Sequence, residues 1–284
     1  MKRRASVLLE ALPYIRRFHG KILVLKLGGA LMEEKLMDSI CQDIVLLNYV
    51  GMKPLVVHGG GSDISEEMEK AGKKPKFIEG LRVTDEETMD IIYKSLGKIN
   101  KKIVLGLGKH GGKSIGISGI DGGLVRAKKV EGKGKEKLGL VGEVEEIDAS
   151  VVNYLINTGY IPVIAPMGAD AEGTSLNLNA DTVAAELSTS LQAEKFILLT
   201  DVPGVLEDQE NKNSLIPRIT LEDAQKLIEE KTVTEGMITK LKACAKSVKG
   251  GVKRAHIING TTPHALLLEL LTESGVGTMI EEAG

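Results

Sequence analysis

Tryptophan is absent from this sequence of 284 residues, and aromatic residues make up only 3% of it. So few flat side chains disfavour a protein that stacks the bases of single-stranded nucleic acid on aromatic rings. The net charge of −2 gives no strong field for DNA, RNA or an anionic membrane surface. We therefore expect neither nucleic acid nor a membrane among the partners of this chain.

Cysteine is also scarce, and long apolar runs are missing. Cys41 and Cys244 stand in helical patterns without CxxC spacing, so we predict two small buried thiols rather than a disulfide framework or a zinc site. No run reaches the roughly 18 apolar residues of a membrane-spanning helix. The basic N-terminus is interrupted by Glu10 and lacks the pattern of a signal peptide. These observations predict a cytoplasmic protein.

What the sequence does contain is a regular alternation of apolar runs and helical patterns. Ile22–Leu27 and Ile161–Ala165 are almost wholly apolar, as expected of strands that are buried on both faces. Strands that alternate with helices favour a parallel sheet. We predict an α/β/α fold, in which an open, mainly parallel sheet is sandwiched between helices. Further strands are predicted at 54–57, 114–118, 196–200, 255–258 and 277–280, and helices at 36–50, 64–71, 85–108, 149–158, 181–191, 220–230, 237–248 and 263–271.

One segment departs from this alternation. Residues 121–145 are rich in glycine and predict hairpins at one edge, with a Lys/Glu/Gly-rich tip at 129–137. A shallow division follows near 170–176. It would separate an N-terminal lobe, residues 1–175, from a C-terminal lobe, residues 176–284.

Two glycine clusters follow the first two predicted strands. Lys26–Gly29 closes the first strand and His58–Gly61 closes the second, each directly before a helix. Ligands bind at the carboxyl ends of parallel strands, where glycine lets backbone N–H groups approach an anion. The clusters are either ordinary turns or adjacent sites for a phosphate and a carboxylate. Lys26 ends a buried strand, where its ammonium group needs either a phosphate or a local carboxylate.

Polar residues in three later segments fit the same edge of the sheet. Arg82 precedes a predicted helix, and its guanidinium suits either a bidentate grip on a carboxylate or a surface ion pair. The Asn-Leu-Asn-Ala-Asp stretch at 177–181 places its three polar side chains on one side if it is extended. Residues 199–205 end a strand in a glycine-containing loop, and residues 236–240 open a helix with a second lysine.

In this order, the motifs resemble the amino acid kinase family, over about residues 7–280. Within that family they most resemble the branch that phosphorylates N-acetyl-L-glutamate. The resemblance implies the family's α/β/α fold and ATP-dependent phosphorylation of the γ-carboxylate of N-acetyl-L-glutamate, the second step of arginine biosynthesis. The stretches that carry it are Lys26–Gly29, Val57–Gly61, Gly80–Asp85, Gly119–Gly123, Asn177–Asp181, Leu199–Val205, Gly236–Lys240 and His256–Leu270.

The resemblance also implies roles for single residues. Lys26 and Lys240 would flank the transferring phosphoryl group, and Asp181 would hold both lysines in place. Gly28 and Gly29 would contact phosphate oxygens through their backbone N–H groups. Mg²⁺ would be bound through the phosphates of ATP, without a metal site of the protein's own. N-acetyl-L-glutamate would bind Gly60, Gly61, Arg82 and Asn177, with Arg82 on a carboxylate, and ATP would lie against Thr200, Asp201, Gly204, Val205 and Met237.

The expected chemistry needs few catalytic side chains. Phosphoryl transfer requires alignment and neutralisation of charge, and the nucleophile is already a carboxylate, so neither a general base nor a catalytic histidine is required. Two departures from the family pattern concern Thr239, where proline is usual, and Asp63, an acid close to the site of an acidic substrate. The competing interpretations are a kinase of the same fold for glutamate, aspartate, carbamate or UMP, and a binding module without catalysis.

The N-terminal segment carries a second expectation. Residues 5–17 form a helical pattern that Pro13 should kink, and its apolar face either contacts a partner chain or covers its own core. This helix resembles that of the arginine-inhibited, hexameric members of the family. The resemblance implies feedback inhibition by L-arginine and a trimer of dimers, or otherwise a dimer, with a PII-type signalling protein as a further candidate partner. Arginine would contact Tyr14, Lys195, His256, Glu269 and Gly275.

Overall fold

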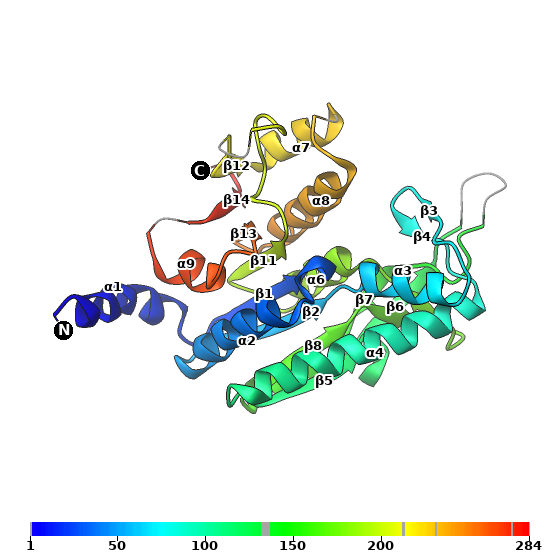
Figure 1. Cartoon of the computed structure of the whole chain (residues 1–284), viewed down its shortest axis with the longest axis horizontal. Helices are drawn as coiled ribbons and strands as arrows, with labels where there is room; N and C mark the ends of the chain where they lie inside the picture. Colours follow the sequence, from blue (N-terminus) through cyan, green and yellow to red (C-terminus); the bar gives the residue numbers. More distant parts are fainter. Residues whose placement is uncertain (1, 132–136, 212–213, 231, 274, 284) are drawn as a thin grey trace.

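The computed structural model describes residues 2–131, 137–211, 214–230, 232–273 and 275–283. An eight-stranded sheet lies at its centre (Figure 1). Every neighbouring pair in this sheet is parallel except β13 and β14, so the prediction of an open, mainly parallel sheet is confirmed. In spatial order the strands are β12 (Arg218–Thr220), β14 (Gly277–Glu281), β13 (Arg254–Asn259), β11 (Lys195–Thr200), β1 (Ile22–Leu27), β2 (Lys53–His58), β8 (Ile161–Ala165) and β5 (Ser114–Ser118).

Helices cover both faces of this sheet. Leu23 and Leu25 of β1 pack toward one face, and Val24 between them packs toward the other, because successive side chains of a strand alternate. Both faces are buried, which explains why the central strands are apolar over most of their length. The first face is covered by α2 (Glu34–Tyr49), α4 (Glu86–Lys109) and α9 (Ala265–Leu271), and the second by α5 (Ser150–Asn157), α6 (Ala180–Ser190), α7 (Leu221–Glu229) and α8 (Glu235–Lys249).

A second, four-stranded sheet contains the glycine-rich segment. The predicted hairpin is confirmed as the antiparallel pair β6 (Val125–Lys129) and β7 (Gly142–Ile147). Two strands that the sequence did not predict, β9 (Met167–Ala169) and β10 (Ser175–Asn177), complete the sheet. Each has only three residues, which is too short for a periodic pattern. The predicted tip at 129–137 lies largely outside the described residues.

A two-stranded hairpin was also not predicted. It consists of β3 (Phe77–Ile78) and β4 (Leu81–Arg82). Its turn residues Glu79 and Gly80 both have a positive φ, 49° and 79°, as tight two-residue hairpin turns require. This hairpin follows α3 (Gly61–Lys70) and leads directly into α4.

The N-terminal helix α1 (Lys2–Phe18) is confirmed and runs through Pro13. It projects from the body of the molecule and packs against α9 (Figure 1). Phe18 at its end is buried in the core, whereas Leu9 and Leu12 are 68% and 46% exposed. A contact of this helix with a partner chain stays a prediction. No helix within the described part of the chain is long and apolar enough to cross a membrane.

Both cysteines are buried thiols, as predicted. Burial raises the pKa of Cys41 to about 12. The division into lobes stays a prediction. The strands on its two sides belong to one sheet, because β1 pairs with both β2 and β11.

Candidate active site

A cavity of about 370 Å³ opens at the carboxyl ends of β1 and β2. It brings together residues that the sequence places far apart, because parallel strands end at one edge of their sheet. We call it the acceptor cavity. The predicted site residues in its lining are Lys26, Gly29, Gly60, Gly61, Arg82, Asn177 and Asp181.

A buried ion pair forms one wall of the acceptor cavity. The ammonium nitrogen of Lys26, on β1, lies 2.6 Å from a carboxylate oxygen of Asp181, and both side chains are at most one-tenth exposed. The local carboxylate that the sequence left open as a partner for Lys26 is thus Asp181. Burial alone would raise the pKa of Asp181, but the charges of Lys26 and Lys240 outweigh it and hold this pKa below its usual value. The carboxylate is therefore ionised between two lysines.

The position of Asp181 is set by the start of α6. Asn179 caps this helix by accepting a hydrogen bond from the Thr182 N–H at 3.0 Å. Asp181 was predicted near the cap and lies two residues after it, in the first turn, where the helix dipole favours a carboxylate. Asn179 also lines the acceptor cavity.

A second cavity, of about 280 Å³, lies at the carboxyl end of β11 and the start of α8. We call it the nucleotide cavity. The Nζ atom of Lys240 is 3.4 Å from the Gly236 carbonyl oxygen, and the charge of Lys240 acts on Asp181 of the acceptor cavity. Lys240 therefore stands between the two cavities. The lining of the nucleotide cavity contains four residues that were predicted to contact ATP: Thr200, Asp201, Gly204 and Met237.

Two predicted residues lie outside both linings. The Gly28 N–H donates to the Leu199 carbonyl at 2.9 Å, because the pairing of β1 with β11 continues one residue past the strand. The predicted phosphate contact through this N–H is therefore corrected, since the group is already paired. Val205 is fully buried, and its N–H donates to the Thr278 hydroxyl at 2.8 Å.

Arg82 is buried without a carboxylate. Only 6% of the residue is exposed, and no acidic group among the described residues pairs with it. Its guanidinium donates to the Gly61 carbonyl and the Ser65 hydroxyl, both at 2.8 Å, and stacks 4.6 Å from the Phe77 ring centre. The predicted alternative of a surface ion pair is wrong. Arg82 instead directs an uncompensated positive charge into the acceptor cavity.

Several lining residues were not predicted. Ser62, Phe77 and Leu96 line the acceptor cavity, and Gln209 and Thr234 line the nucleotide cavity. Thr234 had a recognisable signal, because a threonine before an α-helix is a typical cap, and its hydroxyl accepts from the Met237 N–H at 3.3 Å. The others reach the cavities through tertiary packing.

His58, at the end of β2, is fully buried. Its Nδ1 lies 3.0 Å from the Gly59 carbonyl, and its Nε2 lies 3.3 Å from the amide nitrogen of Asn100. Burial lowers the pKa of His58 to about 4, so the ring is neutral. Nδ1–H then donates to Gly59 and Nε2 accepts from Asn100. These contacts indicate a structural role for His58 beside the glycine cluster.

A third cavity, of about 360 Å³, lies between α1, α9 and the sheet. We call it the α1–α9 cavity. Glu269 is buried in it, 2.7 Å from His256 Nδ1 and 3.7 Å from Lys195 Nζ. Burial would raise the pKa of Glu269, but the hydrogen bond from His256 and the charge of Lys195 keep it below its usual value. The five residues predicted to contact arginine all line this cavity: Tyr14, Lys195, His256, Glu269 and Gly275.

Comparison with known proteins agrees with this geometry. Residues 21–259 match the amino acid kinase family. The acetylglutamate kinase of Methanosphaera stadtmanae is 50% identical over 290 residues, which cover 98% of this chain and 97% of that protein. The chain belongs to the amino acid kinase family, and at this identity it groups there with the acetylglutamate kinases.

Solved structures show the same fold. N-acetylglutamate synthase from Neisseria gonorrhoeae, complexed with coenzyme A and N-acetyl-glutamate, superposes with a TM-score of 0.90 at 26% identity. The same enzyme complexed with coenzyme A and L-arginine gives 0.89 at 25% identity. The match covers 99% of this chain in both cases but only 64% and 66% of the synthase chains.

The neutral state of His58 yields a prediction on stability. Because the unfolded chain binds a proton near pH 6.5 and the folded chain only near pH 4, the contribution of His58 is fully present above about pH 6.5 and is lost as the pH falls toward 4. Urea unfolding at pH 7 and pH 5 should show this loss, and His58→Gln should lack it. A ring that titrates near pH 6.5 by NMR in the folded protein would contradict the assignment.

Proposed function

We propose that this protein is a cytoplasmic enzyme that transfers the γ-phosphoryl group of ATP to the γ-carboxylate of N-acetyl-L-glutamate, the second step of arginine biosynthesis. The observation that carries the proposal is the buried guanidinium of Arg82, which shares one cavity with the Lys26–Asp181 pair and lacks a carboxylate of its own. A dicarboxylate with a blocked amino group satisfies both cationic ends of this cavity.

One carboxylate of the substrate binds Arg82. A buried guanidinium gains most from a ligand that accepts two hydrogen bonds in one plane, as a carboxylate does. Asn177 lies in the same lining and offers amide groups for hydrogen bonding. The other carboxylate then points toward Gly60 and Gly61 at the start of α3 and toward Lys26. The helix N-terminus and the lysine both favour negative charge there.

Transfer takes place between Lys26 and Lys240. An oxygen of the γ-carboxylate bonds to the γ-phosphorus as the bond from phosphorus to the β–γ bridging oxygen breaks, which leaves ADP. The two ammonium groups neutralise charge on the moving group, and Asp181 holds them apart and in line. The backbone N–H of Gly29 contacts the phosphate oxygens, whereas Gly28, which has no side chain, allows the phosphate to approach the backbone closely.

ATP occupies the nucleotide cavity. Thr200 and Asp201 supply oxygen atoms there that can act as metal ligands, and the threonine hydroxyl donates a hydrogen bond to the aspartate at 3.1 Å. Mg²⁺ prefers such ligands, so the cavity fits a nucleotide that brings Mg²⁺ on its phosphates. When bound, the ion supplies further neutralisation of phosphate charge. Gly204 and Met237 shape the cavity, and Val205 supports it from the core.

The substrate is tested by an ATP-dependent hydroxamate assay. We expect product with N-acetyl-L-glutamate and none with L-glutamate or L-aspartate. The free α-amino group of these two acids is protonated and would place a second positive charge next to Arg82. Carbamate and UMP complete the panel. Activity on a non-acetylated acid alone would overturn the substrate assignment and leave the roles of the lysines intact.

Asp181→Asn should lower kcat at least about a hundredfold, because the neutral amide no longer holds the two lysines. The matched control is Glu186→Gln on the same helix, where the carboxylate pairs with Lys246 away from both cavities. The control should retain kcat. Circular dichroism and the melting temperature show whether both variants are folded. Near-normal turnover of Asp181→Asn would remove this residue from the mechanism.

We also propose that L-arginine binds the α1–α9 cavity and inhibits the enzyme. Glu269 is the carboxylate that a guanidinium requires, and the Nε2 atom of His256 is buried without a partner in the described residues. The structural similarity to a synthase solved with L-arginine supports the assignment. The exposed apolar side chains of α1 suit contact with a second chain, and we propose a hexamer built as a trimer of dimers. In our proposal lobe 1–175 carries most of the acceptor site, to which Asn177 and Asp181 contribute from lobe 176–284, and lobe 176–284 carries the nucleotide site. A PII-type protein remains a candidate partner.

Deletion of residues 1–17 should give dimers that ignore arginine. The deletion removes Tyr14 from the cavity and takes away the helix that would join the dimers. Light scattering measures the mass, and the hydroxamate assay with and without L-arginine measures inhibition. Hexamers that keep full inhibition after deletion would refute both parts of this proposal.

A further inference from the structure

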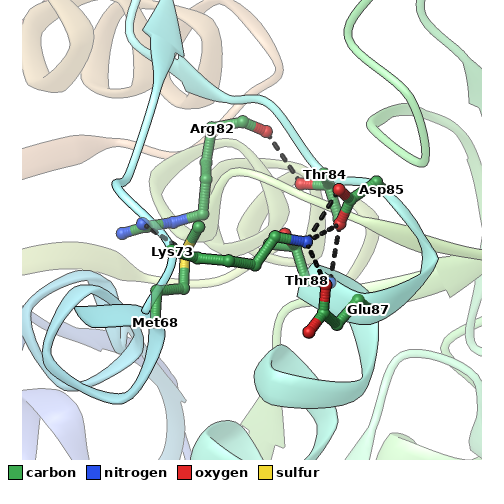
Figure 2. A network of polar contacts seen from close by, with 7 residues as sticks. All are labelled: Met68, Lys73, Arg82, Thr84, Asp85, Glu87 and Thr88. Atoms are coloured by element: carbon green, nitrogen blue, oxygen red, sulfur yellow. Dashed lines mark hydrogen bonds and ion pairs between the residues drawn. The ribbon is translucent and has the colours of Figure 1, made fainter. Parts of the chain in front are cut away.

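Thr84 is a fully buried threonine that links the two residues assigned to the substrate. Its hydroxyl donates to the Arg82 carbonyl at 2.8 Å, as Figure 2 shows. The same hydroxyl lies 3.2 Å from Nδ2 of Asn177. Arg82 and Asn177 are almost a hundred residues apart in the sequence and belong to different sheets. Thr84 thus forms a direct side-chain connection between them.

The hydrogen bonds of Thr84 fix the orientation of the Asn177 amide. A hydroxyl has one proton, and a carbonyl can only accept, so the proton points to Arg82. The oxygen then presents a lone pair to Asn177, which must offer its NH₂ group. The carbonyl oxygen of Asn177 is therefore turned away from Thr84. Without the hydroxyl, both orientations of the amide become accessible.

The backbone of Thr84 is held independently of its hydroxyl. Its N–H donates to the Leu138 carbonyl at 2.9 Å, and its carbonyl accepts from the Leu140 N–H at 2.6 Å. The Leu140 carbonyl in turn accepts from the Asn177 N–H at 2.9 Å. Residues 138–140 thus fix the two backbones relative to each other, so the hydroxyl is left to set side-chain direction rather than the path of the chain.

The next residue is anchored as well. Asp85 caps α4 by accepting from the Thr88 N–H at 2.8 Å, and Lys73 lies 2.7 Å from both of its carboxylate oxygens. Lys73 also pairs with Glu87 at 2.9 Å (Figure 2). The ends of the β3–β4 hairpin are thereby held together. Loss of one buried hydroxyl does not release this anchor.

We infer that Thr84 is a positioning residue for the acceptor substrate. Its hydroxyl, whose proton is held by the Arg82 carbonyl, keeps the Asn177 amide in one orientation. The inference rests on the proposed function. It assigns Thr84 no contact with ATP and no part in the transfer step.

The test compares Thr84→Val with Thr84→Ser. Valine keeps the shape and removes the hydroxyl, which leaves the Arg82 carbonyl and the Asn177 amide unpaired. We expect the KM for N-acetyl-L-glutamate to rise about tenfold, the effect of losing one or two buried hydrogen bonds. The KM for ATP should change less than about twofold. Serine restores the hydroxyl and should return the first KM to within about threefold of wild type.

Thr88→Val is the matched control. It removes a buried hydroxyl one helical turn further on, which interacts with Asp85 and not with the substrate residues. Its KM for N-acetyl-L-glutamate should match that of the wild type. If valine at position 84 prevents folding, Thr84→Ala removes the same hydroxyl without bulk and carries the same expectation.

A double-mutant cycle separates positioning from general destabilisation. In an Asn177→Ala background, Thr84→Val should raise the KM much less than in the wild type, because the residue through which it acts is gone. Additive effects, or an unchanged KM in Thr84→Val, would overturn the inference while wild-type activity upholds the proposed function. A wild-type enzyme inactive on N-acetyl-L-glutamate would overturn both.

Discussion

The buried ion pair between Lys26 and Asp181 is the interaction on which the site depends. Removing two charges from water is costly, and their attraction offsets this cost only with short, well-aligned contacts. The 2.6 Å separation meets that condition. It requires β1 to end beside the first turn of α6, and thus requires both the sheet and the helix layer to be in place. The pair leaves Lys26 in the lining of the acceptor cavity, where the proposed function places the phosphoryl group.

Arg82 shows the opposite arrangement, since its charge is buried without an acid. Neutral oxygens of Gly61 and Ser65 satisfy part of its hydrogen-bonding capacity, and Phe77 stacks on it. Such a site is less stable by itself than one with a carboxylate, and a substrate carboxylate supplies what is missing. In the proposed function, the acceptor cavity therefore combines the compensated charge of Lys26, which neutralises the transferred group, with the uncompensated charge of Arg82, which selects the ligand.

Much of the fold was predictable because it follows from local pattern. β1 and β8 begin and end where their apolar runs do, since strands covered on both faces admit few polar residues. The short β3, β4, β9 and β10 were not predicted, because two or three residues carry no period. Ser62 and Leu96 were missed as lining residues for a related reason. Each lies on a helix, and a helical pattern does not show which of its residues face a cavity.

The sequence by itself determined the class of fold, the two glycine clusters at one sheet edge, and the lysines, arginine and acid that a kinase of this family requires. The fold class and the glycine clusters follow from residue type and short-range spacing, whereas the roles of the lysines, the arginine and the acid follow from the resemblance to the family. Only the tertiary structure decided that Asp181 partners Lys26, that the Gly28 N–H is already paired, and that Thr84 joins Arg82 to Asn177. Those facts depend on hydrogen bonds and ion pairs between segments distant in the chain, which local pattern does not encode.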